Sequence, residues 1–178
     1  MACPCSTLCC HPVSMSHNQV EDMRLIIIVA VMLGVPTSVS AWPASIVKVI
    51  DGDSLIAEPI SGGGQVKVRL YGVDAPEMKQ PGGQSASEFV RGATLYKVVE
   101  IRPAAQGHDR YGRTVAVVIL PSGDSLQALL IHEGLAWVYP RYCRDCTEWT
   151  ALQEEARRLN RGLWAAPYPV PPWEWRRR

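Results

Sequence analysis

Apolar and polar residues alternate along two neighbouring segments, a pattern typical of strands with one buried face. The first segment spans 45–50 and resumes at 54–58, and the second spans 65–73. Gly52 interrupts the first segment and indicates a bulge or sharp bend that re-aims the side chains around it. A glycine-rich turn at 61–64 joins the two segments. The pattern therefore predicts a bent strand followed by a hairpin.

Three later segments have apolar residues at steps of three and four, the spacing of an amphipathic helix. The helical segments are 84–97, 125–134 and 147–160, the β runs between the first two are 98–102 and 114–120, and a loop is expected at 103–109. Short strands with a helix late in the sheet are compatible with a small Greek-key barrel. We therefore predict a β-barrel with helices.

The 178 residues suffice for one domain with a core and some additional segment. Hydrophobic residues make up 47% of the chain and charged residues 20%, which is typical of a globular protein and argues against disorder. The formal net charge of +1 excludes a strong overall field that would attract nucleic acid or membrane. Any binding of a polyanion must therefore come from a local arrangement of charges.

The segment 23–41 has the pattern of an export signal. A basic residue, Arg24, precedes an apolar run that is short for a membrane span, and small residues follow up to Ala41. We expect cleavage after Ala41, with Trp42 as the mature N-terminus and a secreted or periplasmic protein without a membrane span. The alternative is an uncleaved signal that anchors the protein in the membrane.

Residues 1–22 precede this signal, so the segment is either a long charged region or an extension upstream of a true start at Met15 or Met23. Its crowded cysteines lack a second paired spacing, which argues against a metal site. The later pair, Cys143 and Cys146, is expected to form a disulfide in an exported protein. Zinc binding or redox activity would need ligands or a surrounding pattern that the sequence does not provide.

Acidic residues gather where the two strand segments end. Asp51 and Asp53 flank the glycine bend, Asp74 and Glu77 follow the second strand, and Arg69 lies five residues before Asp74. Each aspartate alone could be a turn residue. Carboxylates beside a fixed guanidinium together suit a hard divalent cation that faces a phosphate. The sequence therefore predicts a site for phosphate chemistry here, with Asp51 supporting Asp53.

Residues 45–164 resemble the staphylococcal nuclease-like (thermonuclease) family. The motifs that carry the resemblance are Val49-Ile50-Asp51-Gly52-Asp53-Ser54, Arg69-Leu70-Tyr71-Gly72-Val73-Asp74-Ala75-Pro76-Glu77, Asp109-Arg110-Tyr111-Gly112-Arg113, Gly134-Leu135-Ala136-Trp137-Val138-Tyr139 and Gly162-Leu163-Trp164. Each motif alone is weak, but together and in this order they are specific. The resemblance implies a domain at 42–164 with a five-stranded OB-fold Greek-key barrel, three α-helices and calcium-dependent hydrolysis of DNA and RNA.

The resemblance also implies roles for individual residues. The calcium ligands would be Asp53, Asp74 and the main-chain carbonyl of Ala75, with other divalent ions not excluded. Glu77 would orient or deprotonate the attacking water. The phosphate would be bound by Arg69 and Arg113, and the nucleotide would be contacted by Arg110, Tyr111 and Tyr139 or Tyr142. The loop after Glu77 is shorter than in the namesake enzyme, and Cys143 and Cys146 are absent from it.

These residues favour an exported, calcium-dependent nuclease that acts on DNA, RNA or both as a monomer without a stable protein partner. A non-catalytic OB-fold module that binds nucleic acid is the alternative, although it would not need the full set of acids and arginines. The proline-rich tail 165–178 is expected to be extended. Its tryptophans could stack on bases while its arginines bind phosphate. The tail could also make the contacts of an extracellular or envelope interaction domain. The favoured interpretation is that the tail packs on domain 42–164.

Overall fold

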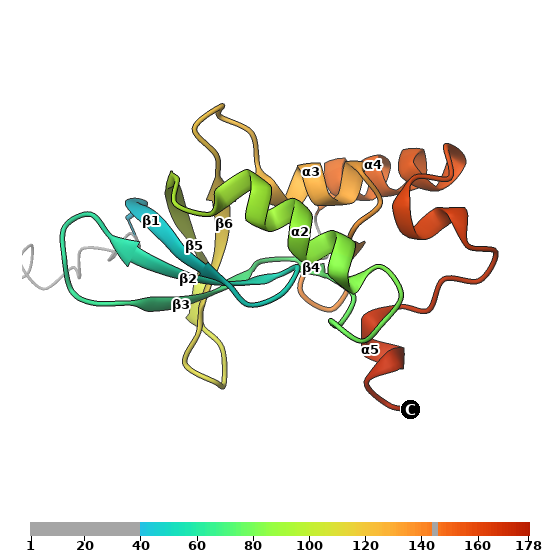
Figure 1. Cartoon of the computed structure of the whole chain (residues 1–178), viewed down its shortest axis with the longest axis horizontal. Coiled ribbons are helices and arrows are strands. Elements are labelled where there is room, and N and C mark those ends of the chain that lie inside the picture. Colours follow the sequence, from blue (N-terminus) through green and yellow to red (C-terminus); the bar gives the residue numbers. More distant parts are fainter. Residues whose placement is uncertain (1–39, 144–145) are drawn as a thin grey trace, which may run out of the picture. The chain divides into compact units, whose positions relative to one another are not determined.

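Five strands close into a barrel in the computed structural model (Figure 1). The barrel strands are β1 (Trp42–Val49), β2 (Ser54–Pro59), β3 (Val66–Leu70), β5 (Val98–His108) and β6 (Thr114–Ile119). Their order around the barrel is β1-β2-β3-β6-β5, and β1 closes it by pairing antiparallel with β5. The β3–β6 pair is parallel, whereas the other pairs are antiparallel. The predicted five-stranded barrel is therefore confirmed.

The structure describes residues 40–143 and 146–178. The expected upstream extension 1–22 and nearly all of the expected signal 23–41 lie outside these ranges, so cleavage after Ala41 stays a prediction. Among the described residues, no helix has both the length and the apolar character needed to cross a membrane.

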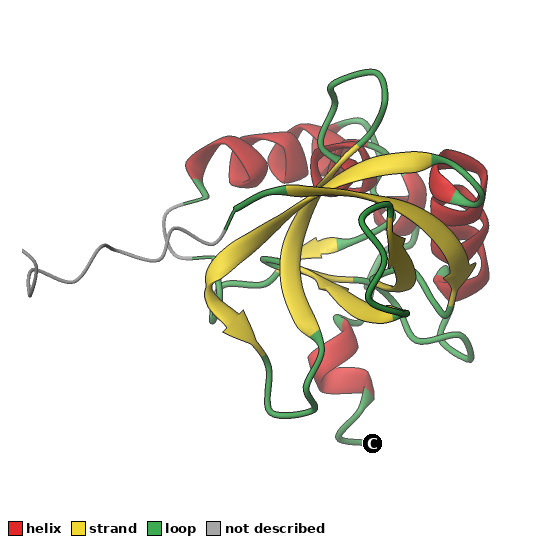
Figure 2. Ribbon diagram, turned by 90° about the vertical axis from the view of Figure 1, so that its left-hand side faces the viewer, coloured by secondary structure: helices red, strands yellow, loops and turns green. Residues whose placement is uncertain are grey.

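The described residues contain four α-helices, one more than predicted. They are α2 (Gly83–Thr94), α3 (Leu126–His132), α4 (Thr147–Arg158) and α5 (Pro172–Trp175), with a 3₁₀ helix η1 (Gly162–Ala165) before α5. Figure 2 shows the helices outside the curved strands of the barrel. The prediction of a wholly extended tail was therefore wrong. Pro172 occupies the first turn of α5, where its fixed φ angle suits a helix and its missing N–H is not needed.

The barrel interior follows the alternation predicted from the sequence. On β3, Val68 and Leu70 are buried in the core, and Arg69 between them points to the opposite face. Apolar residues of α2 and α3 close the core, including Val90 and Leu130. Arg69 is thus held in place by two buried neighbours on a rigid strand.

Residues 103–108 form the second part of β5, although the sequence predicted a loop at 103–109. The pairing of β5 with β6 is regular up to Pro103, then shifts and resumes at His108 opposite Thr114. Such an irregularity accommodates a proline, which cannot donate a hydrogen bond to a regular ladder.

A short second ladder lies beside the barrel. The strands β4 (Val73–Asp74) and β7 (Trp137–Val138) pair antiparallel, with Asp74 opposite Trp137. Directly after β7, the Tyr139 amide donates to the carbonyl of Gly72 at 2.8 Å. This ladder therefore brings Tyr139 to the end of the acidic strand.

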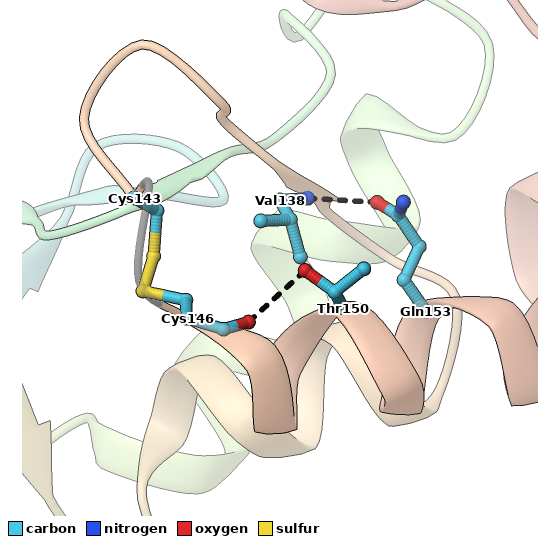
Figure 3. The surroundings of a disulfide bond; sticks show 5 residues. All are labelled: Val138, Cys143, Cys146, Thr150 and Gln153. Atoms are coloured by element: carbon cyan, nitrogen blue, oxygen red, sulfur yellow. Dashed lines mark hydrogen bonds between the residues drawn. A yellow bond between two sulfur atoms is a disulfide. The ribbon is translucent and has the colours of Figure 1, made fainter.

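A disulfide joins Cys143 to Cys146 immediately before α4 (Figure 3). The Cys146 carbonyl accepts a hydrogen bond from the Thr150 hydroxyl at 3.0 Å, and the Val138 amide donates to Gln153 Oε1 at 2.8 Å. Because it closes a very short loop, this cross-link contributes at most about 2 kcal/mol to stability. The disulfide therefore ties Cys143 to the start of α4, and the Val138 bond ties β7 to the middle of that helix.

Candidate active site

The bend after β1 holds Asp53 in place. The Asp53 amide donates to Asp51 Oδ1 at 3.0 Å, and the Leu70 amide donates to the Asp53 carbonyl at 2.9 Å. A Cβ atom on Gly52 would lie only 2.7 Å from the Ala75 Cβ, so the bend needs glycine for this close approach. Burial and the neighbouring Asp53 charge raise the pKa of Asp51 to about 6. Asp51 thus holds the backbone of Asp53 at the bend.

Arg69 bridges the two buried aspartates. Its Nη1 lies 2.9 Å from Asp53 Oδ2, and its Nη2 lies 2.9 Å from Asp74 Oδ1. Asp53 Oδ2 also accepts a hydrogen bond from the Ala75 amide at 2.9 Å. The structure therefore holds Asp53 and Asp74 on one guanidinium and places the backbone of Ala75 against Asp53.

These residues fit a hard divalent cation. The Asp74 side chain has no exposed surface. Burial raises the pKa of Asp74, and repulsion from Asp53 adds to this effect. The hydrogen bond and charge of Arg176 and the charge of Arg69 lower the pKa, but burial outweighs them. A nearby cation would favour the charged carboxylate, and carboxylate and carbonyl oxygens are ligands that calcium prefers. The described residues contain no group of three or more His, Cys, Asp or Glu side chains placed to hold a metal ion. A cation here would therefore need main-chain or water oxygens besides Asp53 and Asp74.

Glu77 lies on the loop between β4 and α2, and this loop is closely packed. The Gln80 amide donates to the Glu77 carbonyl at 2.8 Å, and Gln80 Oε1 accepts from the Glu77 amide at 3.2 Å. A Cβ atom on Gly83 would lie 1.9 Å from the Glu77 carbonyl oxygen, which is impossibly close. Gly83 therefore allows the start of α2 to fix the backbone of Glu77.

Arg113 comes from the turn between β5 and β6, and Asp109 orients it. Asp109 Oδ2 accepts from Arg113 Nε at 2.7 Å, and Asp109 Oδ1 accepts from the Arg113 and Tyr111 amides. Burial raises the pKa of Asp109, but these bonds outweigh it and the pKa is lowered overall. Arg113 Nη1 donates to Ser54 Oγ at 3.4 Å, and that hydroxyl donates to Asp53 Oδ1 at 3.0 Å. Ser54 thus links Arg113 to Asp53, which together with Asp74 forms the acidic cluster of the site.

One cavity of about 820 Å³ unites the predicted site. Its lining includes every predicted catalytic, metal-binding and nucleotide-contacting residue: Asp51, Asp53, Arg69, Asp74, Ala75, Glu77, Arg110, Tyr111, Arg113, Tyr139 and Tyr142. The guanidinium of Arg110 lies 4.7 Å from the ring centre of Tyr111, whose side chain is exposed. An exposed aromatic ring beside arginines can stack on a base. The cavity lining therefore combines acidic, cationic and aromatic groups.

The C-terminal tail supplies lining residues that were not predicted. Trp173, Arg176 and Arg177 border the cavity. Arg176 Nη2 lies 2.6 Å from Asp74 Oδ2, and Arg176 Nη1 lies 2.7 Å from Glu77 Oε1. Burial lowers the pKa of Arg176, but bonds to these two carboxylates outweigh it and raise the pKa overall. The tail's mixture of tryptophan and arginine was noticed in the sequence, but nothing there placed it at this site.

Comparison with known proteins gives the family of the chain. The sequence profile described as "Staphylococcal nuclease homologue" matches residues 67–166, more than half of the chain. The chain belongs to the staphylococcal nuclease family. This confirms the resemblance inferred from the motifs, and with it the class of nuclease enzymes.

Relatives of this staphylococcal nuclease homologue include bacterial and plant proteins. An uncharacterised endonuclease of Escherichia coli O157:H7 is 36% identical over 145 residues, covering 78% of this chain and 92% of its own length. A micrococcal nuclease of Shigella flexneri is 33% identical over 152 residues, covering 79% of this chain and 85% of its own. The staphylococcal-like nuclease CAN1 of Arabidopsis thaliana is 37% identical over 114 residues, covering 62% of this chain and 33% of its own.

Proposed function

We propose that the protein is an exported, calcium-dependent nuclease that hydrolyses phosphodiester bonds of DNA, RNA or both. The observation that carries this proposal is the bridge from Asp53 through Arg69 to Asp74, which opens into the same cavity as Glu77 and Arg113. The micrococcal nuclease of Shigella flexneri supports the same type of activity.

The acidic cluster would hold the calcium ion through Asp53, Asp74 and the carbonyl of Ala75. When bound, calcium would polarise a phosphate oxygen and offset the charge that repels an incoming nucleophile. Arg69 holds both carboxylates in fixed positions through its two terminal nitrogens. Because Arg69 comes from a barrel strand, the cluster needs little rearrangement when substrate binds.

The arginines would stabilise the phosphoryl group as it gains negative charge. A guanidinium offers planar donors and keeps its proton, which suits the equatorial oxygens of a phosphodiester. Asp109 accepts a hydrogen bond from Arg113 Nε and thereby directs the terminal nitrogens of Arg113 towards Ser54 and the acidic cluster. Arg69 would therefore approach the phosphate from strand β3, and Arg113 from the turn between β5 and β6.

Glu77 would position the attacking water or accept its proton. Its side chain is half-exposed and borders the cavity, so water can reach it. Its backbone is fixed through Gln80 and Gly83, which limits the positions available to the carboxylate. A carboxylate in such a place is suited to general-base catalysis.

Digestion of plasmid DNA and of RNA tests this function. Protein purified in chelator should cleave neither substrate, and added calcium should restore cleavage of at least one. Binding to a labelled strand should be measured in parallel by fluorescence anisotropy. Strand binding without cleavage in calcium or in other divalent ions would contradict the proposal and favour the non-catalytic module.

Export is supported by the signal pattern at 23–41 and by the disulfide Cys143–Cys146, since disulfides persist in oxidising compartments. In a bacterial host with its export machinery, we expect the full chain to yield a mature protein that begins at Trp42. Intact-mass measurement of the periplasmic and culture fractions checks this. A full-length chain retained in the membrane fraction would indicate an uncleaved anchor instead.

A further inference from the structure

The tail 165–178 is held along the cavity by packing as well as by charge. Trp173 stacks on Tyr139 with ring centres 5.2 Å apart and an interplanar angle of 16°. It also packs edge-to-face with Trp137, and these two ring centres are 5.8 Å apart. The carbonyl of Val170 accepts a 2.6 Å hydrogen bond from Gln80 Nε2, on the same loop as Glu77. These contacts fix the start of α5, so Arg176 emerges next to the acidic cluster.

Arg176 shares an acceptor with Arg69. Asp74 Oδ1 accepts from Arg69 Nη2 at 2.9 Å and from Arg176 Nη1 at 3.3 Å. Two guanidiniums thus lie within hydrogen-bonding distance of one carboxylate oxygen. A phosphate oxygen near this position would be within reach of both, because phosphate presents the same kind of acceptor to arginine.

The hydrogen bonds from Arg176 to the two carboxylates use only part of its guanidinium donors. Within residues 40–143 and 146–178, its side chain makes three hydrogen bonds, from Nη1 to Asp74 and Glu77 and from Nη2 to Asp74. A guanidinium carries five N–H donors, so the Nε donor and one on Nη2 remain. The side chain is 42% exposed and borders the cavity, which leaves these donors accessible to a ligand.

The charges around Arg69 also favour a role for Arg176 in binding phosphate. Asp53, Asp74 and Glu77 are ion-paired with Arg69 and Arg176, so this cluster has one negative charge in excess. A divalent cation would turn that excess into one positive charge, which matches a single phosphodiester. Without Arg176 the same cluster would be neutral and would attract the strand less strongly.

We propose that Arg176 is a substrate-binding residue that contacts a phosphodiester of the bound nucleic acid, and that Trp173 positions it. This inference rests on the proposed nuclease function and assigns part of its substrate site to the C-terminal tail. Asp74 need not be blocked by Arg176, because a carboxylate has about four acceptor positions and three are used by the two arginines. One position of Oδ2 remains for a cation.

Binding can be measured without cleavage in the Glu77→Gln background, with calcium present and strand integrity checked on a gel. The probe is a fluorescein-labelled single-stranded oligonucleotide titrated at several salt concentrations. Adding Arg176→Gln should weaken binding about tenfold, the loss of one charge-assisted hydrogen bond. It should also reduce the slope of log affinity against log salt by about 0.7, the value for one phosphate contact on a single strand.

The matched control is Arg178→Gln in the same background. Arg178 is exposed on the same tail and is not among the lining residues of the cavity. The control should leave affinity and salt slope unchanged, because it removes the same charge at a site away from the cavity. Equal losses in both variants would overturn the proposal, since they would show only a general charge effect.

Kinetics in the otherwise unchanged protein separate substrate binding from inhibition by the tail. Arg176→Gln should raise KM more than it lowers kcat. Faster cleavage by this variant at limiting calcium would overturn the proposal, because it would show that Arg176 competes with the cation for Asp74. A protein that binds the strand but never cleaves it would contradict the nuclease function, while the binding series would still decide the role of Arg176.

The positioning role of Trp173 has its own test. Trp173→Ala should reduce the salt slope like Arg176→Gln, and the double variant should show no further reduction, since both changes remove the same contact. Trp173→Phe should restore the slope because a phenyl ring can still stack on Tyr139. Additive losses would overturn this positioning role.

Discussion

Glu77→Gln is expected to reduce kcat for phosphodiester hydrolysis by about 10²–10⁴, the usual contribution of general acid–base catalysis. Glutamine has nearly the same shape as glutamate and can still bond to a water molecule, but it cannot accept the proton. The measurement is single-turnover cleavage of a labelled oligonucleotide at saturating calcium. Strand binding should persist, which separates loss of chemistry from loss of substrate.

Glu88→Gln is the matched control for this variant. Glu88 is an exposed glutamate on α2 that accepts a hydrogen bond from Gln84 and does not line the cavity. It should cleave at the rate of the unchanged protein. If Glu77→Gln cleaved at that rate as well, Glu77 would have no part in activating the water.

Arg69→Gln is expected to lower kcat by about 10²–10³, by analogy with removal of one oxyanion donor. The change removes a phosphate donor and also the guanidinium that holds Asp53 and Asp74 together. Arg69→Lys should recover little, because an ammonium group cannot span two carboxylates with planar, fixed donors. Single-turnover rates and calcium affinity by calorimetry should be measured for both variants.

Arg102→Gln provides the comparison for Arg69. Arg102 lies in the same barrel but pairs with Glu100 on an exposed surface outside the cavity. It should keep the full rate, since exposed ion pairs contribute little. Thermal unfolding must accompany these assays, because breaking a buried ion pair can cost about 3–5 kcal/mol of stability. A folded Arg69→Gln protein with an unchanged rate would contradict the assigned role.

Much of the barrel and the acidic half of the site follow from local sequence. The alternation on β3 buries Val68 and Leu70 and therefore directs Arg69 away from the core. The position of Asp51 and Asp53 at a bend could be predicted because Gly52 interrupts the strand pattern between them. Arg113 lies forty-four positions after Arg69, so its place beside the cluster came from the family resemblance and not from periodicity.

The tail shows what local sequence could not provide. Its prolines favoured an extended chain, although Pro172 also suits the first turn of a helix. The bond from Arg176 to Asp74 spans 102 positions, and no periodicity in the sequence specifies a contact between such distant segments. The stack of Trp173 on Tyr139 is likewise a tertiary contact. Neither residue could be assigned to the site before the fold was known.

Asp109 belongs to one of the motifs, but the sequence predicted no role for it. Its side chain accepts from the Tyr111 and Arg113 amides and from Arg113 Nε. An aspartate side chain in a turn often accepts a hydrogen bond from the backbone amide two residues later, so a local signal was present. The direction of the Arg113 side chain could not be predicted, because it depends on a hydrogen bond to Ser54 on the distant strand β2.

The dependence of cleavage on calcium tests the central claim most directly. Protein freed of metal with chelator should be titrated with calcium, and the initial rate of oligonucleotide hydrolysis should be recorded for the unchanged protein and for Asp74→Asn. We expect no cleavage without calcium, a saturable rise with calcium, and a strongly weakened response in Asp74→Asn. Cleavage at the same rate in chelator and in calcium would contradict the metal-dependent site at Asp53 and Asp74.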